Sequence, residues 1–450
     1  MLQLHDPNYI KSLREEIKFE FKNAFNEYME NALGYDHYSP ITRHGYSQFG
    51  LKFSLFDSLD TLLLMNLTEE FENASKYVLQ TTNFTKNSTI SVFESTIRDI
   101  GGLISAYEQT GQRKFLDLAE KLALVLEPAF KTPTGFPYAY INPGTNYTED
   151  HIWNIQKSLL SDIGSLQIEF YSLTYHTGNM KYWNLVNYIE TIANKYILPS
   201  IYFSYQSTYS EVPTSLSFDA FGDSYYEYLL KMALLAPQNS TLYSDYFITA
   251  IKQASKQLLV TSRHKHLEFF KTTVYGQSKH QISHLSYFLP GILYLASREY
   301  PNFKLSEELA DRLMETSVKL HKMTKTGLSG DVLVFGENGM TWEDSTYKLR
   351  PEYIESLFYQ WRVKHKTMSR RLAEDFFNSL KKYSKIGNAY SSVSNVDSSF
   401  PGYEDQMDSF FLAETMKYLY LIFCDDDVIS LDDYVFTTQG HYIKKKDHRR

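Results

Sequence analysis

Two acidic residues open a predicted helix in the stretch Leu349-Arg350-Pro351-Glu352-Tyr353-Ile354-Glu355-Ser356. Proline costs no hydrogen bond in a first helical turn, so the helix is predicted to begin near Pro351. Glu352 and Glu355 lie three residues apart on one helix face, where like charges repel each other. An apolar run, Leu357-Phe358-Tyr359-Gln360-Trp361, follows and indicates a buried helix. Acids in a first turn also complement the helix dipole, and this structural role is the alternative for the stretch taken alone.

Length and composition favour one large closed architecture. The chain has 450 residues, more than a single hydrophobic core usually holds. Hydrophobic residues make up 43% and aromatic residues 16%, and no linker or low-complexity run divides the sequence. We therefore predict a single domain over residues 1–450, with its core at about residues 12–443 and a basic tail at residues 444–450. The net charge of -8 argues against a nucleic-acid partner.

Helical periodicity covers most of the chain, and the predicted helices are of two alternating kinds. One kind is amphipathic with a charged face: Lys11–Asn31, Glu69–Leu79, Lys114–Leu126, Lys181–Ile197, Leu242–Leu259, Ser306–Lys322 and Ser369–Lys385. The other kind is apolar on most sides: Ser54–Met65, Val92–Tyr107, Ile163–Tyr175, Asp223–Leu235, His284–Leu295, Pro351–Trp361 and Ser409–Phe423. A helix that is apolar on all sides must be surrounded by protein. The alternation predicts an all-α, closed α/α toroid, with an open solenoid of helix pairs as the alternative.

Ionisable residues gather at the beginnings of the predicted inner helices. Turn-rich segments with brief strand character, such as 134–140 and 326–331, lead into these helices and are predicted to lie at one end of the toroid. The inner helices then begin at the same end. Their early residues include Asp57, Asp60, Glu94, Arg98, Asp162, Asp223, His284, Arg350, Glu352, Glu355 and Glu414. Taken singly, each has a structural alternative, such as an i,i+4 ion pair for Glu94 with Arg98 or an N-cap for Asp223.

Taken together, these residues indicate a carbohydrate site. Ionisable groups in an apolar ring must be paired or bound to a cation, because their burial is costly. Glycoside hydrolysis needs two carboxyl groups, one protonated towards the leaving oxygen and one ionised. Surplus carboxylates favour a hard cation as well. Aromatic residues, whose faces pack against sugar rings, accompany the acids at Phe93, Tyr225, Phe358, Phe410 and Phe411.

Five motifs, in chain order, resemble those of the class I α-1,2-mannosidases, glycoside hydrolase family 47. They are Phe53–Leu62, Ser91–Glu94 with Gly101–Leu103, Gly222–Leu229, Leu349–Ser356 and Ser409–Tyr420. The resemblance runs from about Phe21 to Tyr442. It implies an (α/α)7 barrel with short loop strands, plugged by a C-terminal hairpin. It also implies calcium-dependent hydrolysis, with inversion, of terminal α-1,2-linked mannose from high-mannose N-glycans.

The resemblance also implies roles for single residues. Glu94 matches the usual proton donor, Asp223 a second essential acid and Glu352 the general base, and the choice of acid between Glu94 and Asp223 stays open. Thr438 is implied to bind Ca²⁺ through its carbonyl and hydroxyl oxygens. An inverting mechanism implies about 6.5–9.5 Å between the two carboxyl groups. Positions that contact the substrate or surround the cation are implied for Arg98, His284, Arg350, Glu355, Phe410 and Glu414.

The chain departs from the family pattern in three places. Gln439-Gly440-His441 stands where the family has Glu-Ala-His, so one acidic group is lost. Tyr287 stands where secretory members often have a cysteine, and Cys424 is the only cysteine in the chain, which excludes an internal disulfide. Asp162 stands where a glutamate is common, which shortens the reach of this acid by a methylene.

Three hypotheses follow. The first is an active mannosidase of the processing branch or of the degradation-enhancing branch, because Glu94, Asp223 and Glu352 are all present. The second, motivated by Gln439, is a mannose-glycan-binding protein of glycoprotein quality control with little or no turnover. The third is a helical scaffold that binds protein partners, for which Glu352→Gln would change nothing.

The resemblance implies a place in the lumen of the endoplasmic reticulum or Golgi, with a quality-control protein as a further partner. No targeting segment is visible at the start of the sequence, and no run of about eighteen apolar residues predicts a transmembrane helix. Six Asn-X-Ser/Thr sequons are relevant only in the secretory pathway. They begin at Asn66, Asn73, Asn83, Asn87, Asn146 and Asn239.

Overall fold

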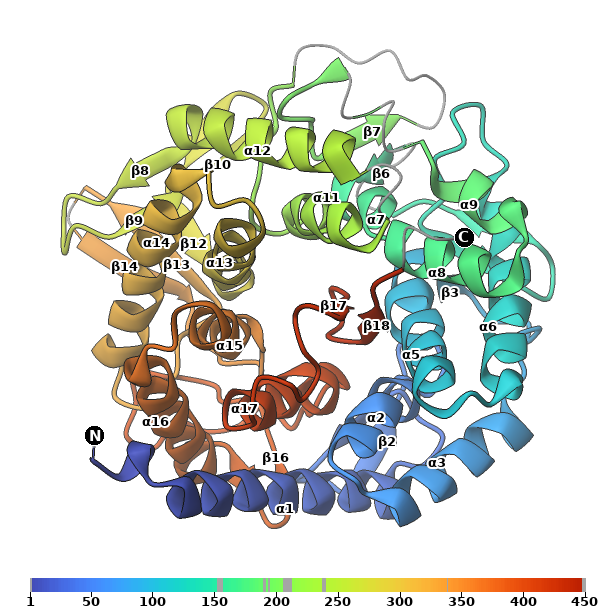
Figure 1. Cartoon of the computed structure of the whole chain (residues 1–450), viewed down its shortest axis with the longest axis horizontal. Helices are drawn as coiled ribbons and strands as arrows, with labels where there is room; N and C mark the ends of the chain where they lie inside the picture. The colour runs from blue at the N-terminus through green and yellow to red at the C-terminus, as the bar shows by residue number, and fades with distance from the viewer. Residues whose placement is uncertain are drawn as a thin grey trace. The chain divides into compact units, whose positions relative to one another are not determined.

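The computed structural model describes residues 2–151, 157–188, 192, 195–204, 213–236, 240–337 and 339–446. The chain divides into two compact units. The first unit comprises residues 1–46, 254–272 and 278–431, and the second comprises residues 47–253, 273–277 and 432–450. Each unit therefore combines segments that are far apart in the sequence. Figure 1 labels their helices and strands.

The first unit is built mainly of helices. Within it, α15 packs against α13, α16 and α17. The helices of this unit are η1 (Leu2–His5), α1 (Pro7–Asn31), η5 (His284–Phe288), α13 (Leu289–Glu299), α14 (Lys304–Met323), α15 (Glu352–Lys364), α16 (Thr367–Tyr383), η6 (Phe411–Thr415) and α17 (Met416–Ile422). Helix α16 buries one face and exposes the other, whereas α17 is buried along its whole length. This difference agrees with the two kinds of helix predicted from the sequence.

Short antiparallel strands lie between the helices of the first unit. They are β1 (His37–Ser39), β2 (His44–Tyr46), β8 (Leu259–Thr261), β9 (Glu268–Phe270), β12 (Gln281–Ser283), β13 (Val332–Gly336), β14 (Gly339–Asp344), β15 (Lys385–Ile386) and β16 (Ala389–Tyr390). Strands β12, β13 and β14 form one sheet, in which Ser283 pairs with Val332 and Val332 with Asp344. Strand β12 ends at Ser283, and β13 begins at Val332 on the same edge of the sheet. The pairing of these two residues therefore brings His284 next to Asp331, and the His284 N–H donates to the Asp331 carbonyl at 2.8 Å.

The second unit contains a second set of helices and short strands. Its helices are α2 (Phe53–Leu64), α3 (Thr68–Thr81), α4 (Val92–Glu94), η2 (Ser95–Ile100), α5 (Gly101–Thr110), α6 (Arg113–Leu126), η3 (Glu127–Phe130), α7 (Leu160–Gly164), α8 (Gln167–Thr177), α9 (Met180–Val186), α11 (Asp223–Leu235) and most of α12 (Ser240–Gln257). Its strands are β3 (Ile90–Ser91), β4 (Tyr140–Asn142), β5 (Tyr147–Glu149), β6 (Lys157–Leu159), β7 (Tyr202–Ser204), β17 (Tyr434–Phe436) and β18 (Tyr442–Lys444). Strands β10 (Thr272–Val274) and β11 (Gln277–Lys279) lie at the sequence boundaries of the units.

Several predicted inner helices begin with irregular turns. The helix predicted for residues 92–107 consists of α4, the π-helix η2 and α5, and the helix predicted for residues 409–423 begins with the π-helix η6. In η2, the Ser95 and Thr96 hydroxyls donate to the carbonyls of Ser91 and Val92 at 2.5 and 2.7 Å. Such hydroxyl bonds to the preceding turn compete with regular helix geometry. The spacing of apolar residues in the sequence does not reveal these hydroxyl bonds, so it could not predict the π-helical turns.

Other element boundaries also differ from the prediction. The segment 326–331 was expected to have strand character, but β13 begins only at Val332, and in 134–140 only Tyr140 belongs to a strand. The helix predicted for residues 163–175 is divided into α7 and α8. The helix predicted for residues 181–197 is represented by α9, and part of its remainder lies outside the described residues.

A C-terminal hairpin of β17 and β18 packs against α11 and α5 in the second unit. Two adjacent glycines at the start of α5, Gly101 and Gly102, allow this helix to pack closely against the hairpin and against α2. A Cβ on Gly101 would lie 2.9 Å from Cδ2 of His441, and a Cβ on Gly102 would lie 2.5 Å from the carbonyl oxygen of Phe56. Side chains at these two positions would therefore force α5 away from the hairpin and from α2.

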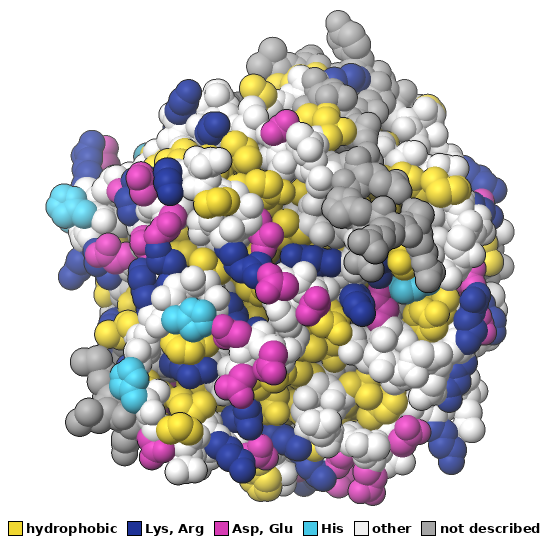
Figure 2. Space-filling model, in the orientation of Figure 1, with side chains coloured by type: hydrophobic (Ala, Val, Ile, Leu, Met, Phe, Trp, Pro, Cys, Tyr) yellow, Lys and Arg dark blue, Asp and Glu magenta, His cyan; other side chains and the backbone are white. Residues whose placement is uncertain are grey.

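The described surface carries charges of both signs. Figure 2 shows basic and acidic side chains interspersed on one face. Among the described residues, no helix combines the length and the apolar character that crossing a membrane requires.

We expect Gly102→Ala to lower the thermal stability of the protein. The added methyl group would collide with the backbone of Phe56, and overpacking of this kind costs about 1–3 kcal/mol. Gly336→Ala is the control, because the nearest atom to a Cβ at that position is the Gly339 oxygen, 3.9 Å away. Circular dichroism melting curves measure both effects, and equal melting temperatures for the two variants would contradict the packing argument.

Candidate active site

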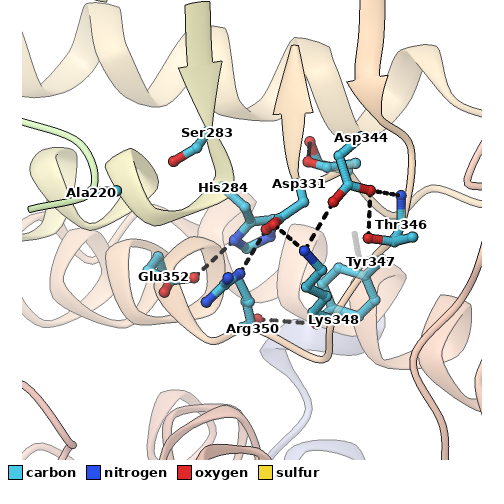
Figure 3. A network of polar contacts seen from close by, with 12 residues as sticks. Ala220, Ser283, His284, Asp331, Asp344, Thr346, Tyr347, Lys348, Arg350 and Glu352 are labelled. Carbon is cyan, nitrogen blue, oxygen red and sulfur yellow. Dashed lines mark hydrogen bonds and ion pairs between the residues drawn. The ribbon is translucent and has the colours of Figure 1, made fainter. Parts of the chain in front are cut away.

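Glu352 and His284 form the central pair of the predicted site residues in the first unit. Glu352 is the first residue of α15, as expected from Pro351, and His284 is the first residue of η5. Nδ1 of His284 lies 2.8 Å from Oε2 of Glu352, within hydrogen-bond distance, and the tautomer with a proton on Nδ1 donates to this oxygen (Figure 3). The His284 side chain is 1% exposed and the Glu352 side chain 13%, so the histidine supports the acid from inside the protein.

Arg350 is anchored by an acid that the sequence did not single out. Nε of Arg350 donates to Oδ1 of Asp331 at 2.7 Å, and Nζ of Lys348 donates to Oδ2 of the same residue at 2.6 Å (Figure 3). Lys348 also binds Asp344 at 2.9 Å, and Asp344 accepts hydrogen bonds from the backbone and hydroxyl of Thr346. Asp331 directly precedes β13, and no local sequence pattern indicates that the sheet brings it to Arg350.

These ion pairs shift the protonation equilibria of their members. Burial raises the pKa of the Asp331 carboxyl, but Arg350 and Lys348 lower it more, so the pKa lies below the usual aspartate value. Burial lowers the pKa of the Arg350 guanidinium, whereas Asp331 and Glu352 raise it to a net value above the usual one. Both groups are therefore charged at neutral pH.

The backbone before Arg350 adopts a strained conformation. Leu349 has φ 61°, in the left-handed region that is unfavourable for a side chain with a Cβ. Its carbonyl accepts a hydrogen bond from the Thr415 hydroxyl at 2.7 Å, and the Arg350 carbonyl accepts one from the Tyr347 hydroxyl at 3.0 Å. Both bonds hold the turn that leads into α15. Strain of this kind is often retained at functional sites.

The remaining predicted residues of the first unit are also placed by η6 and α15. Glu355 and Glu414 are buried, and the Tyr418 hydroxyl lies 3.4 Å from Oε1 of Glu355. Phe410 is half-buried immediately before η6. Tyr287, one of the departures from the family pattern noted in the sequence, is buried, and its hydroxyl lies 2.8 Å from Oγ of Ser329.

Glu94 and Arg98 form the predicted i,i+4 pair in the second unit. Nε of Arg98 donates to Oε2 of Glu94 at 2.7 Å, and Nη1 donates to Oδ2 of the fully buried Asp57 at 3.1 Å. The Arg98 guanidinium also lies over the Phe53 ring, 5.3 Å from its centroid. Burial lowers the pKa of Arg98, but Glu94 and Asp57 raise it to a net value above the usual one. Arg98 therefore links Glu94, which is 25% exposed, to a buried acid.

Asp223 begins α11 but is not its N-cap. The N-cap is Gly222, and Oδ1 of Asp223 accepts a hydrogen bond from the Ser224 N–H at 2.8 Å. The structural alternative, in which Asp223 is the N-cap of this helix, is therefore wrong, because the N-cap is the preceding residue. Asp162 pairs with His151 at 2.8 Å, a contact that the sequence did not predict. Burial raises the pKa of Asp162, His151 lowers it less, and the net pKa is above the usual value.

Thr438 lies in the turn of the hairpin, near a group of oxygen atoms. Its N–H lies 3.4 Å from the Tyr228 hydroxyl, which donates to Oε1 of Glu169 at 2.7 Å. Oε2 of Glu169 is buried and has no hydrogen-bond partner among the described residues. Burial raises the pKa of Glu169 to about 8. A pKa of about 8 favours the protonated carboxyl at neutral pH, whereas a cation beside Oε2 would favour the carboxylate. Oxygen atoms are the ligands that Ca²⁺ prefers.

We expect Asp331→Asn to destabilise the protein at neutral pH by about 1.5–3 kcal/mol, because the amide is uncharged and its NH2 group cannot accept one of the two hydrogen bonds from Arg350 and Lys348. The folded-state pKa of Asp331 is below its usual value of 3.8, so its contribution is present above that value and disappears as the pH falls through the folded-state pKa. Melting curves from pH 7 down to pH 3 should therefore converge for the two proteins. Asp117→Asn, in an exposed pair with Arg113, is the control with a small effect. A difference that stays constant down to pH 3 would contradict the assignment.

Comparisons with known proteins place the chain in a family. The sequence model of glycosyl hydrolase family 47 matches residues 20–445. The endoplasmic reticulum mannosyl-oligosaccharide 1,2-alpha-mannosidases of Mus musculus and Homo sapiens are 34% and 35% identical over 94% of the chain. The chain spans 66% and 62% of the length of these two relatives. Mannosyl-oligosaccharide 1,2-alpha-mannosidase MNS1 of Arabidopsis thaliana is 34% identical over 96% of the chain and 79% of its own length.

A solved structure is also similar. The alpha-1,2-mannosidase from Trichoderma reesei superimposes with a TM-score of 0.89 and 25% identity, over 97% of this chain and 99% of that one. This match confirms the predicted fold class, the (α/α)7 barrel. Because the family model covers most of the sequence, the resemblance found in the motifs is confirmed as well, and the chain belongs to glycosyl hydrolase family 47.

Proposed function

We propose that this protein is a calcium-dependent, inverting α-mannosidase that removes terminal α-1,2-linked mannose from high-mannose N-glycans of glycoproteins. Family membership supports the reaction class, and the relatives that match most of the chain are named as 1,2-alpha-mannosidases. The observation that carries the proposal is the hydrogen bond from buried His284 to Glu352. This hydrogen bond orients the Glu352 carboxylate at the start of α15, and a general base must be oriented in this way towards the proton that it accepts.

Glu352 is assigned as the base that takes a proton from the attacking water. The His284 N–H engages Oε2, which fixes the carboxylate and leaves Oε1 to accept the proton. The Arg350 guanidinium, held in place by Asp331, supplies hydrogen-bond donors for sugar hydroxyls beside this base. Glu355, Phe410 and the remaining predicted binding residues are assigned to sugar or cation contacts.

Glu94 and Asp223 are the two candidates for the acid that protonates the leaving oxygen. Each has a partner that fixes one carboxylate oxygen, Arg98 for Glu94 and the Ser224 N–H for Asp223. α-Mannosyl fluoride separates the two roles, because its leaving group needs no proton. The variant that lacks the acid, Glu94→Gln or Asp223→Asn, is expected to hydrolyse the fluoride far better than the disaccharide.

Thr438 is proposed as the protein ligand of calcium, through its carbonyl and hydroxyl oxygens. Glu169 supports this assignment, because its buried Oε2 has no hydrogen-bond partner in the described part of the chain and is connected to the Thr438 backbone by Tyr228. A bound calcium ion would supply positive charge that balances a negative charge on Glu169, and the ion could also orient sugar hydroxyls. Tyr228 keeps Oε1 of Glu169 occupied, so Oε2 is the oxygen that remains for a cation or its water shell.

The whole chain is proposed to form one catalytic domain, since the family model spans segments of both units. The endoplasmic reticulum or Golgi lumen is proposed as its location, and the names of two mammalian relatives contain the first of these compartments. Gln439 motivates the second candidate function, a mannose-glycan-binding protein with little turnover, which acts together with a quality-control partner.

Release of free mannose from a high-mannose N-glycan tests the proposed reaction. NMR should detect β-mannose as the first product, and chelation of calcium should stop its release. Glu352→Gln should lower kcat by about 10²–10⁴-fold, because the amide cannot accept the proton. Glu315→Gln on α14 is the control, since this acid is exposed and pairs with Lys319. A wild-type protein that binds the glycan and releases no mannose would support the binding function instead.

The sequons provide a test of the proposed location. All five sequon asparagines within the described residues are exposed, and they are Asn66, Asn73, Asn83, Asn87 and Asn146. Expression through a eukaryotic secretory pathway should therefore yield N-glycans that peptide-N-glycosidase removes, with a mass shift in the gel. Thr85→Ala is a matched control that keeps Asn83 and should abolish modification at this site alone. Peptides that remain unmodified at all five sites would argue against passage through the lumen.

A further inference from the structure

Gln439 occupies a fixed position in the hairpin turn of the second unit. The Thr437 N–H donates to the His441 carbonyl at 2.8 Å, and the Gly440 N–H donates to the Thr437 carbonyl at 3.0 Å. The Gln439 N–H lies 3.3 Å from Oγ1 of Thr437. Because these backbone bonds close the turn, the Gln439 side chain leaves it in one direction, and it is only 3% exposed.

This side chain begins a series of hydrogen bonds that ends at Glu94. Nε2 of Gln439 donates to Oδ2 of Asp57 at 3.0 Å, and Nη1 of Arg98 donates to the same oxygen at 3.1 Å. Nε of Arg98 then donates to Oε2 of Glu94 at 2.7 Å. Each bond lies within the second unit, and the first three residues of the series are buried or nearly buried. These three hydrogen bonds connect Gln439 to Glu94 through Asp57 and Arg98.

The chemistry of an amide suits this position. Oδ2 of Asp57 accepts from two donors, and His441 lies 3.4 Å from its other oxygen. A carboxylate in place of the Gln439 amide would set two negatively charged acceptors about 3 Å apart, which requires a shared proton or a cation between them. The neutral Gln439 amide satisfies Asp57 without either, so Asp57 can hold Arg98 in one orientation.

We propose that Gln439 is a positioning residue for the acid–base chemistry of this site: it fixes Asp57, and Asp57 with Arg98 orients the Glu94 carboxylate. This inference rests on the proposed function, in which Glu94 is one of the two candidate acids. Gln439 does not itself touch the reacting atoms. In this proposal, the departure from the family pattern at residue 439 acts on the Glu94 carboxylate through hydrogen bonds to Asp57 and Arg98.

Gln439→Leu tests the proposal, because leucine has a similar volume and no donor. We expect kcat on a high-mannose glycan to fall about tenfold, while KM stays within about twofold, since orientation of Glu94 matters in the transition state. The assay is run at low and at saturating calcium. The same loss at both concentrations supports the proposal, whereas recovery of kcat at high calcium would show that Gln439 acts on the metal and would overturn it.

A double-mutant cycle with Arg98→Lys tests the route. The lysine keeps the positive charge but loses the forked geometry that joins Asp57 to Glu94. If Gln439 acts through Arg98, adding Gln439→Leu to this variant changes kcat less than about twofold, so the effects are not additive. Additive losses would overturn the proposed series of bonds. Both single variants keep most of the side-chain volume, and melting curves verify that they fold.

Gln167→Leu is the matched control for a purely structural loss. Gln167 is a buried glutamine of the same unit, and its Nε2 donates to the Ile163 carbonyl at 2.9 Å. This variant should lose thermal stability and keep its kcat. Glu94→Gln distinguishes a wrong assignment of Glu94 from a wrong role for Gln439. If it leaves kcat unchanged, the role of Glu94 in the proposed function is wrong, whereas a strong loss together with an unaffected Gln439→Leu would overturn only the present inference.

Discussion

The cost of burying charged side chains is the constraint on which both units depend. An isolated carboxylate is poorly tolerated away from water, so a buried acid needs hydrogen-bond donors close to it. In the first unit, Arg350 and Lys348 meet at Asp331. In the second unit, Arg98 and Gln439 meet at Asp57. In each case the buried acid collects donors that are distant in sequence and thereby fixes the side chains beside the candidate catalytic residues.

Irregular backbone places these charges. Leu349 takes a left-handed conformation directly before Arg350, and the Thr415 hydroxyl stabilises that turn. The π-helix η2 carries Arg98 and follows Glu94, whereas η6 carries Glu414. Extra residues in a helical turn change the direction of the side chains that follow, and such bulges often occur at functional sites. The regular parts of the same helices supply the packed core that holds these turns.

Local sequence patterns predicted some features of the candidate site and missed others. The i,i+4 spacing of Glu94 and Arg98 predicted an ion pair that the structure contains. The motif around Pro351 predicted the beginning of α15 and the position of Glu352 in its first turn. The same reasoning missed Asp331 and the pairing of His151 with Asp162, because the partners of these residues are brought together by short strands and loops. A strand of three to five residues leaves little periodicity in a sequence.

The sequence by itself determined the alternation of amphipathic and apolar helices, the family motifs and hence the fold class. These features are local or repeat at the helical period, so each can be recognised without knowledge of the partner segment. Only the tertiary structure decided which donors satisfy each buried acid. It showed that Gln439, which in the sequence is simply the loss of an acid, donates a hydrogen bond to Asp57. The physical reason is that a hydrogen bond between residues 382 positions apart depends on how the hairpin and α2 pack, and no local spacing encodes that contact.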